Sequence, residues 1–204
     1  MKRLYIYFAF SLLFCAPLLG KDLPGKVIFK DRTIDVVIDV PFRLIPSKPD
    51  FEIMQHRINY IDAQGKKIKL RPQDALEVQF KYDDELIRMI SVNRVFTGAL
   101  HIGADEDYKF LKLEMDGKLK LYTLYRTDYS NSKLKTVPHS KRIENAVFQK
   151  GSDPIIIVEW GTFKKDMRKF FSDCPALIQK IDSKEFDRKD TDKITEFYNS
   201  KCGK

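Results

Sequence analysis

Residues 108–125, YKFLKLEMDGKLKLYTLY, decide the fold that we expect for this chain. Apolar and polar side chains alternate on both sides of Asp116-Gly117, which is typical of two strands that each bury one face. An Asp-Gly pair between two such runs is a strong hairpin signal, because glycine adopts the positive φ that a tight turn requires. The stretch therefore predicts an antiparallel β-hairpin.

Short β-rich runs surround this hairpin and predict more strands of the same kind. Their side chains are largely β-branched or aromatic, and short polar turns separate them. The predicted pairs are 27–29 with 34–38, 58–61 with 68–70, and 76–82 with 86–92, and residues 155–158 form a last buried strand. Residues 41–55, which hold three prolines, are expected to be a loop with short extended pieces, and the polar residues 128–142 are expected to be a loop or a frayed strand.

From residue 162 the apolar side chains recur with helical spacing. Phe163, Met167 and Phe171 form the first stripe, Asp173 and Pro175 begin a second helix, and a third begins near Asp190. The sequence predicts an α+β fold. An antiparallel, hairpin-rich β domain over 22–160, which is a curved sheet, a sandwich or an open barrel, precedes C-terminal helices over 162–204 that pack on it.

The first twenty residues have the features of a secretory signal peptide. A basic start precedes the apolar residues 4–14, and Gly20 offers a small residue for cleavage. Cys15 raises the alternative of a lipoprotein, but the bulky Phe14 before it argues against lipid attachment. We expect a soluble periplasmic or secreted protein. Removal of residues 1–20 takes away Lys2 and Arg3, which leaves 35 basic and 29 acidic side chains and a net charge of +6.

Composition excludes two broad classes of protein. With 43% hydrophobic and 12% aromatic residues, the chain is too apolar to be disordered, and 32% charged residues exclude a polytopic membrane protein. Cleavage after residue 20 leaves Cys174 and Cys202, and an even number of cysteines in an exported chain predicts a disulfide. This bond would join the start of the second helix to the end of the third.

No catalytic or metal-binding motif stands out in the sequence. His56, His101 and His139 lack the spacing of metal ligands, no nucleophile motif is present, and no glycine-rich loop indicates a cofactor. The acidic clusters 83–85 and 105–107 are explained by turns, which favour Asp. We therefore expect no metal and no cofactor. A hydrolase that uses scattered carboxylates and His101 remains an alternative.

Basic side chains form three clusters that could contact a polyanion. Two alternate with apolar residues and are equally typical of the solvated face of a strand or helix. The candidate contacts are Lys66, Lys67, Lys69 and Arg71 in one cluster and Lys164, Lys165, Arg168 and Lys169 in another. The third cluster contains Lys133, Lys135, Lys141 and Arg142.

Several short motifs give the chain a resemblance to a known group. They are PGKVI at 24–28, GKKIKLRPQD at 65–74, FLKL at 110–113, DGKLKLY at 116–122, FFSDCP at 170–175 and FYN at 197–199. With these motifs the chain resembles a group of exported Bacteroidetes proteins of uncharacterised function. The resemblance implies export and the architecture above, and it brings no catalytic residues.

The function that we expect is that of an exported, non-enzymatic binding or cell-envelope assembly protein. Its partner would be a protein or a small molecule in the cell envelope. A basic protein that binds a membrane surface or a polyanion, such as an acidic lipid or glycan, is the second alternative beside the hydrolase. Nucleic acid is not an expected partner.

Overall fold

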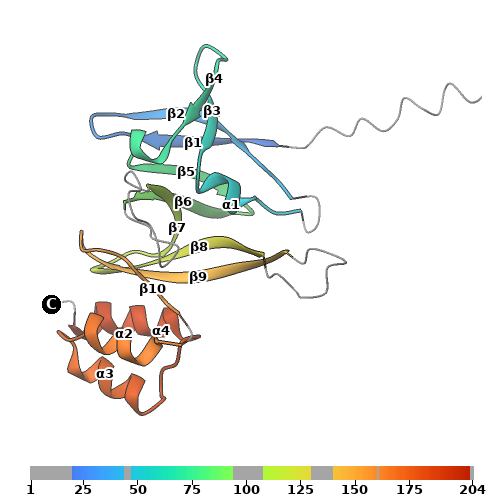
Figure 1. Ribbon diagram of the computed structural model, residues 1–204. Helices are drawn as coiled ribbons and strands as arrows, with labels where there is room; N and C mark the ends of the chain where they lie inside the picture. The colour runs from blue at the N-terminus through green and yellow to red at the C-terminus, as the bar shows by residue number, and fades with distance from the viewer. Residues whose placement is uncertain (1–19, 44–46, 94–107, 130–139, 160, 203–204) are drawn as a thin grey trace, which may run out of the picture.

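The computed structural model describes residues 20–43, 47–93, 108–129, 140–159 and 161–202. They form an α+β fold in which one curved, antiparallel sheet of ten strands is followed by C-terminal helices (Figure 1). The strand order is β10-β9-β8-β7-β6-β5-β1-β2-β3-β4, so β10 and β4 are the two edges. This arrangement confirms the predicted fold class, as a curved sheet.

The strands follow the chain in antiparallel pairs. Their bounds are β1 (Lys21–Ile28), β2 (Thr33–Val40), β3 (Ile58–Ile61), β4 (Lys67–Leu70), β5 (Glu77–Tyr82), β6 (Glu85–Val92), β7 (Lys109–Met115), β8 (Leu119–Tyr129), β9 (Ser140–Lys150) and β10 (Ile156–Ile157). The order departs from that of the sequence where β1 pairs with both β2 and β5. The meander of β5 to β10 thereby continues into β1 to β4.

The hairpin predicted at Asp116-Gly117 is present. Strand β7 pairs with β8 across this turn, with a bulge between Leu113 and Met115. Gly117 has φ of +153°, and a Cβ atom at this position would lie 2.4 Å from Nδ2 of Asn199. Both the conformation and the close approach of Asn199 therefore require glycine here.

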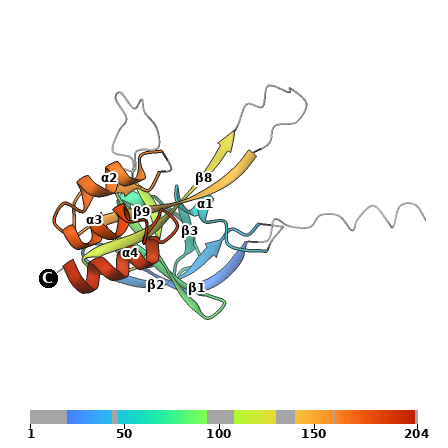
Figure 2. The same cartoon turned by 90° about the horizontal axis from the view of Figure 1, so that it is seen from below.

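The longest pair of strands is β8 and β9, with eleven residues each. Their register runs without interruption from Leu119–Lys150 to Tyr129–Ser140. The partner strands on either side are shorter, so the far part of this pair extends away from the rest of the sheet (Figure 2). Of the two alternatives for 128–142, a loop or a frayed strand, both ends are strand, since β8 ends at Tyr129 and β9 begins at Ser140. Sequence analysis did not identify the rest of β9.

Two buried clusters hold the ends of the fold together. In the first, strands β1 to β6 pack around the short helix α1 (Phe51–Met54), with Met54, Ile38 and Phe80 almost completely buried. In the second, helices α2 (Phe163–Phe170), α3 (Pro175–Asp182) and α4 (Thr191–Phe197) cover β8 and β9, below the sheet in Figure 1. Burial of these apolar side chains is the main source of stability.

Two amide side chains bind the main chain of β8 where its pairing with β7 ends. At one end, Leu119 N–H donates to Oδ1 of Asn199 at 2.8 Å, and Nδ2 of Asn199 donates to Leu119 O at 2.9 Å. At the other, Tyr125 N–H donates to Oε1 of Gln55 at 2.7 Å, and Nε2 of Gln55 donates to Tyr125 O at 2.8 Å. Each amide acts as a substitute for the missing strand residue.

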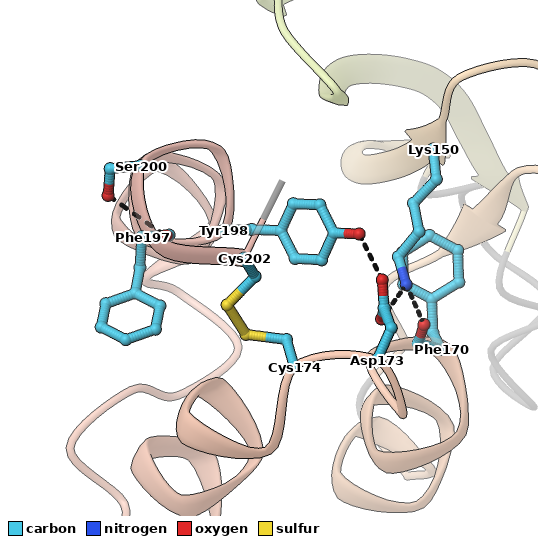
Figure 3. The surroundings of a disulfide bond; sticks show 8 residues. All are labelled: Lys150, Phe170, Asp173, Cys174, Phe197, Tyr198, Ser200 and Cys202. Atoms are coloured by element: carbon cyan, nitrogen blue, oxygen red, sulfur yellow. Dashed lines mark hydrogen bonds and ion pairs between the residues drawn. A yellow bond between two sulfur atoms is a disulfide. The ribbon is translucent and has the colours of Figure 1, made fainter. Parts of the chain in front are cut away.

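The predicted disulfide between Cys174 and Cys202 is present, with a Cα–Cα distance of 5.6 Å (Figure 3). Cys174 precedes α3, and Cys202 ends the helical turn η2 (Tyr198–Cys202) that continues α4. The bond therefore ties the last helical turn to the start of α3. No helix among the described residues is long and apolar enough to cross a membrane.

Lys150 at the end of β9 binds the helices beside this disulfide (Figure 3). Its Nζ atom donates to Phe170 O and to Asp173, and it lies 5.0 Å from the ring centre of Tyr198. Tyr198 Oη also donates to Asp173. Although burial alone would raise it, the pKa of Asp173 is lowered by the hydrogen bonds from Lys150 and Tyr198.

Two further details differ from the sequence prediction. The loop expected over 41–55 contains α1, which supplies Met54 to the core. The alternation of apolar and polar residues over 76–82 predicts a buried Leu76 and an exposed Glu77, yet Leu76, just before β5, is 45% exposed and Glu77 only 9%. Glu77 is buried because Arg88 on the neighbouring strand donates to both of its carboxylate oxygens.

Candidate functional site

Two adjoining hollows lie on this part of the molecule, the first between α2 and the segment that precedes α4, and the second between strands β8 and β9 and the segment that follows β10. The first, of about 650 Å³, is lined by Gly161, Thr162, Phe163, Lys164, Lys165, Arg168, Asp187, Arg188 and Lys189. The second, of about 660 Å³, is lined by Arg126, Arg142, Ile143, Glu144, Asn145, Glu159, Gly161 and Arg188. The two hollows adjoin at Gly161 and Arg188, which line both, and we name the pair the basic groove.

Positive charge dominates this groove. Seven of its described lining residues are cationic, namely Arg126, Arg142, Lys164, Lys165, Arg168, Arg188 and Lys189. Three are acidic, namely Glu144, Glu159 and Asp187. A concave surface that concentrates one sign of charge attracts ligands of the opposite sign more strongly than a flat one does.

Helix α2 supplies the cations at one end of the groove. Arg168 forms an ion pair with Asp182 at 2.8 Å, and Lys164 Nζ donates to Asp182 O at 3.1 Å. These contacts hold α2 against the end of α3. Lys165 and Lys189 are exposed, and within the described residues no hydrogen bond or ion pair engages their ammonium groups. These two lysines are therefore available to a ligand.

Strands β8 and β9 supply the cations at the other end. Arg126 donates from Nε and from a terminal nitrogen to Oδ1 of buried Asn145, at 3.1 and 2.9 Å. Arg142 pairs with Asp50 at 3.2 Å and with Glu52 at 3.1 Å. These partners fix both guanidinium groups in place before any ligand binds, which lowers the entropic cost of binding.

Among the described residues, the outer edge of β9 has no partner along this part of the groove. The last bond in the described residues on that edge is from Val158 N–H to Ala146 O, at 2.9 Å. Beyond it the chain leaves the sheet toward Glu159, whereas β9 continues for six more residues to Ser140. The second hollow lies beside residues 142–145, where β9 pairs with β8 but no described strand pairs with its outer edge.

The predicted basic clusters do not share one surface. Lys67 and Lys69 lie on β4, the opposite edge of the sheet from β10, and Lys66 and Arg71 flank that strand. Asp39 binds Lys67 at 2.6 Å and raises its pKa. A single polyanion surface formed by all clusters is therefore not present.

The groove combines predicted and unpredicted residues. Lys164, Lys165 and Arg168 come from a predicted cluster, whereas Lys169 is exposed on α2 outside the groove lining. Arg142 comes from the third cluster; Lys133 and Lys135 lie outside the described residues, as does the side chain of Lys141. Sequence analysis missed Arg126, Arg188 and Lys189. The only local signal for the last two is the Arg-Lys pair before the third helix.

The residues proposed for a hydrolase do not come together in the described part of the chain. His101 and the acidic cluster 105–107 lie outside it, and Asp83 and Asp84 form the turn between β5 and β6 with φ of 48° and 64°. A neighbouring hollow of about 410 Å³, which shares Glu144 and Asn145 with the second hollow, contains Glu114, Glu144, Asp192 and Glu196. Within the described ranges no His, Cys, Asp and Glu side chains form a group that could hold a metal ion.

Comparison of the chain with models of known protein families, with curated proteins and with solved structures finds no match. The groove itself is therefore the feature of this chain that bears on its function.

Proposed function

We propose that this chain is an exported, non-enzymatic binding protein that holds an anionic ligand in the basic groove. The observation that carries the proposal is the position of Lys165 and Lys189, two exposed lysines without a described partner in a depression with five more cations. The positive charge of the groove would attract the ligand, and the guanidinium groups of Arg126 and Arg142, which are held in place before binding, would orient it.

Export is supported by two independent features. Residues 1–20 have the basic start, apolar run and small residue of a signal peptide. The Cys174–Cys202 disulfide is a bond that persists in oxidising compartments and is rare in the cytosol. A partner in the periplasm or outside the cell follows from this proposal.

The test is a charge reversal with a matched control. Lys165→Glu with Lys189→Glu reverses two charges in the groove, whereas Lys66→Glu with Lys69→Glu reverses two exposed charges near the β4 edge. Both double variants have the same net charge. Binding of a fluorescent acidic peptide and of a heparin fragment is measured at low and at physiological salt.

We expect the groove variant to weaken binding of at least one probe by about tenfold or more at low salt, because reversing each charge replaces an attraction by a repulsion. The β4 variant should change binding by less than about twofold. Equal losses in both variants would mean that net charge, and not the groove, binds the probes, and the proposal would then be wrong.

A further inference from the structure

We propose that the ligand of the basic groove is an extended, acidic polypeptide segment that adds to the sheet as a strand beside β9. This inference rests on the proposed function and names the class of partner. It depends on the direction of the main-chain groups of β9, on the space beside them and on the charges around that space.

The main-chain N–H and C=O groups of Glu144 lie in the plane of the sheet and point away from β8, toward the outer edge of β9. In an antiparallel strand these groups alternate in direction from one residue to the next. Ala146 O accepts from Val158 on the β10 side, so Glu144 and Arg142, two and four residues earlier, face that same side. Strand β10 ends before it reaches them.

The pairing of β8 gives the same result independently. Tyr125 is the register partner of Glu144, and its own N–H and C=O bind Gln55 on the side away from β9. Tyr125 and Glu144 are therefore a non-hydrogen-bonded pair, in which both residues direct their main-chain groups outward. The open stretch from 140 to 145 is long enough for about five to six residues of an added strand.

The groove provides space and charge for such a strand. The hollow of about 660 Å³ lies along residues 142–145, in line with β10. Arg126 is the register partner of Ile143, so Arg126 and Arg142 belong to opposite faces of the sheet. Acidic side chains on both faces of an added strand would each find a guanidinium group. A chain that continues past Arg188 would reach Lys165 and Lys189.

The two edges of the sheet differ in a way that favours strand addition at β9. Proteins protect open edges with short strands and lysines, and β4 has four residues with Lys67 and Lys69 exposed on it. The β9 edge is instead accompanied by a hollow that a strand could fill. Strand addition obtains affinity from main-chain hydrogen bonds, which a glycan cannot form in this repeating pattern.

The experiment isolates the outward N–H of Glu144 in the disulfide-bonded full chain. Glu144→Pro removes this N–H without breaking a bond to β8, and Glu144→Gln makes the same change of charge but keeps the N–H. The probes are a fluorescent peptide of about twelve residues rich in Glu and Val, its two versions N-methylated at alternate residues, and a heparin fragment.

We expect Glu144→Gln to bind the peptide more tightly than the parent protein does, because it removes a carboxylate that repels the acidic peptide. Glu144→Pro should bind it about tenfold more weakly than Glu144→Gln, although both have lost the repelling carboxylate. One of the two N-methylated peptides should also bind about tenfold more weakly than the other, since only one set of its N–H groups faces β9. The heparin fragment should not distinguish Pro from Gln.

The N-methylated peptides test the parent protein directly, so the inference stays testable if Glu144→Pro does not fold. Equal binding of both N-methylated peptides would overturn strand addition. Binding of heparin without binding of the peptide would also overturn it. After either of these two outcomes the proposal of an anion-binding groove survives if Lys165→Glu with Lys189→Glu still weakens binding of a probe. Failure of every anionic probe to bind would overturn the proposed function and this inference together.

Discussion

Replacing Gln55 by Met should destabilise the protein far more than the loss of one polar side chain on a surface would. Gln55 is 1% exposed, and its amide forms two hydrogen bonds to the main chain of Tyr125, at 2.7 and 2.8 Å. Methionine has a similar length and volume, so the packing of α1 against β8 should change little. The main effect is on Tyr125, whose N–H and C=O both lose their partner.

The magnitude follows from these two groups. A main-chain donor or acceptor left unpaired in the interior costs about 1–3 kcal/mol. Two such groups give an expected loss of roughly 2–6 kcal/mol in the free energy of unfolding, against the roughly 5–15 kcal/mol that is typical of a domain. The variant should still fold under native conditions, with a clearly lower urea midpoint and an unchanged slope of the transition.

Urea unfolding of Gln55→Met and of the control Gln73→Met provides the measurement. Gln73 is exposed in the turn η1 (Pro72–Asp74), so its replacement should change stability by less than about 0.5 kcal/mol. Hydrogen exchange at the Tyr125 amide gives a local readout. A loss below about 0.5 kcal/mol with Tyr125 still protected from exchange would refute the reasoning, because it would show that β8 does not depend on this amide.

Three other predictions concern stability. Cys202→Ser should lower the free energy of unfolding by roughly 3–4 kcal/mol, because the disulfide closes a loop between residues 28 apart; an equal thermal midpoint for the oxidised parent and the variant would contradict this. The pKa of Asp173 is lowered in the folded state, so the stability that its carboxylate contributes is present at neutral pH and is lost as the pH falls through that lowered value. The difference in thermal midpoint between the parent and Asp173→Asn should be largest near pH 7 and should shrink as the pH falls below the ordinary carboxyl value of 3.8, whereas a difference that grows toward acid would show that the sign is wrong. Gly25→Ala should lower the free energy of unfolding by urea by about 1–3 kcal/mol, since the new Cβ atom would lie 2.4 Å from Gln79 O between β1 and β5. The control Gly65→Ala, with open space around its Cβ position, should show only the strain of its positive φ.

The parts of the fold that sequence analysis identified are those with a local cause. The Asp116-Gly117 turn, the Pro175 helix start and the period of Phe163, Met167 and Phe171 each lie within a few residues of the structure that they specify. The disulfide followed from the small number of cysteines and from their positions at helix ends. Such signals are readable because neighbouring residues determine turn and helix chemistry.

The parts that sequence analysis missed depend on distant partners. Strand β9 begins with polar residues whose burial is made possible by other strands, as Asn145 is by Arg126. Glu77 resembles a solvent-facing residue until Arg88 is placed beside it. The cations of α2 could be predicted because they lie within one short helical run. The cations on β8 and β9 could not, because their position depends on the register of β9, a strand that had not been identified.

The two amides that bind β8 have a consequence for how the chain loses its structure. Gln55 precedes Tyr125 by 70 residues, and Asn199 follows Leu119 by 80, so one strand is joined to segments far away on both sides along the chain. Opening either end of β8 releases α1 or the last helical turn at the same time. The sheet and the C-terminal helices are thereby coupled into one cooperative unit, in which denaturation of the helices and of the sheet follows a single transition.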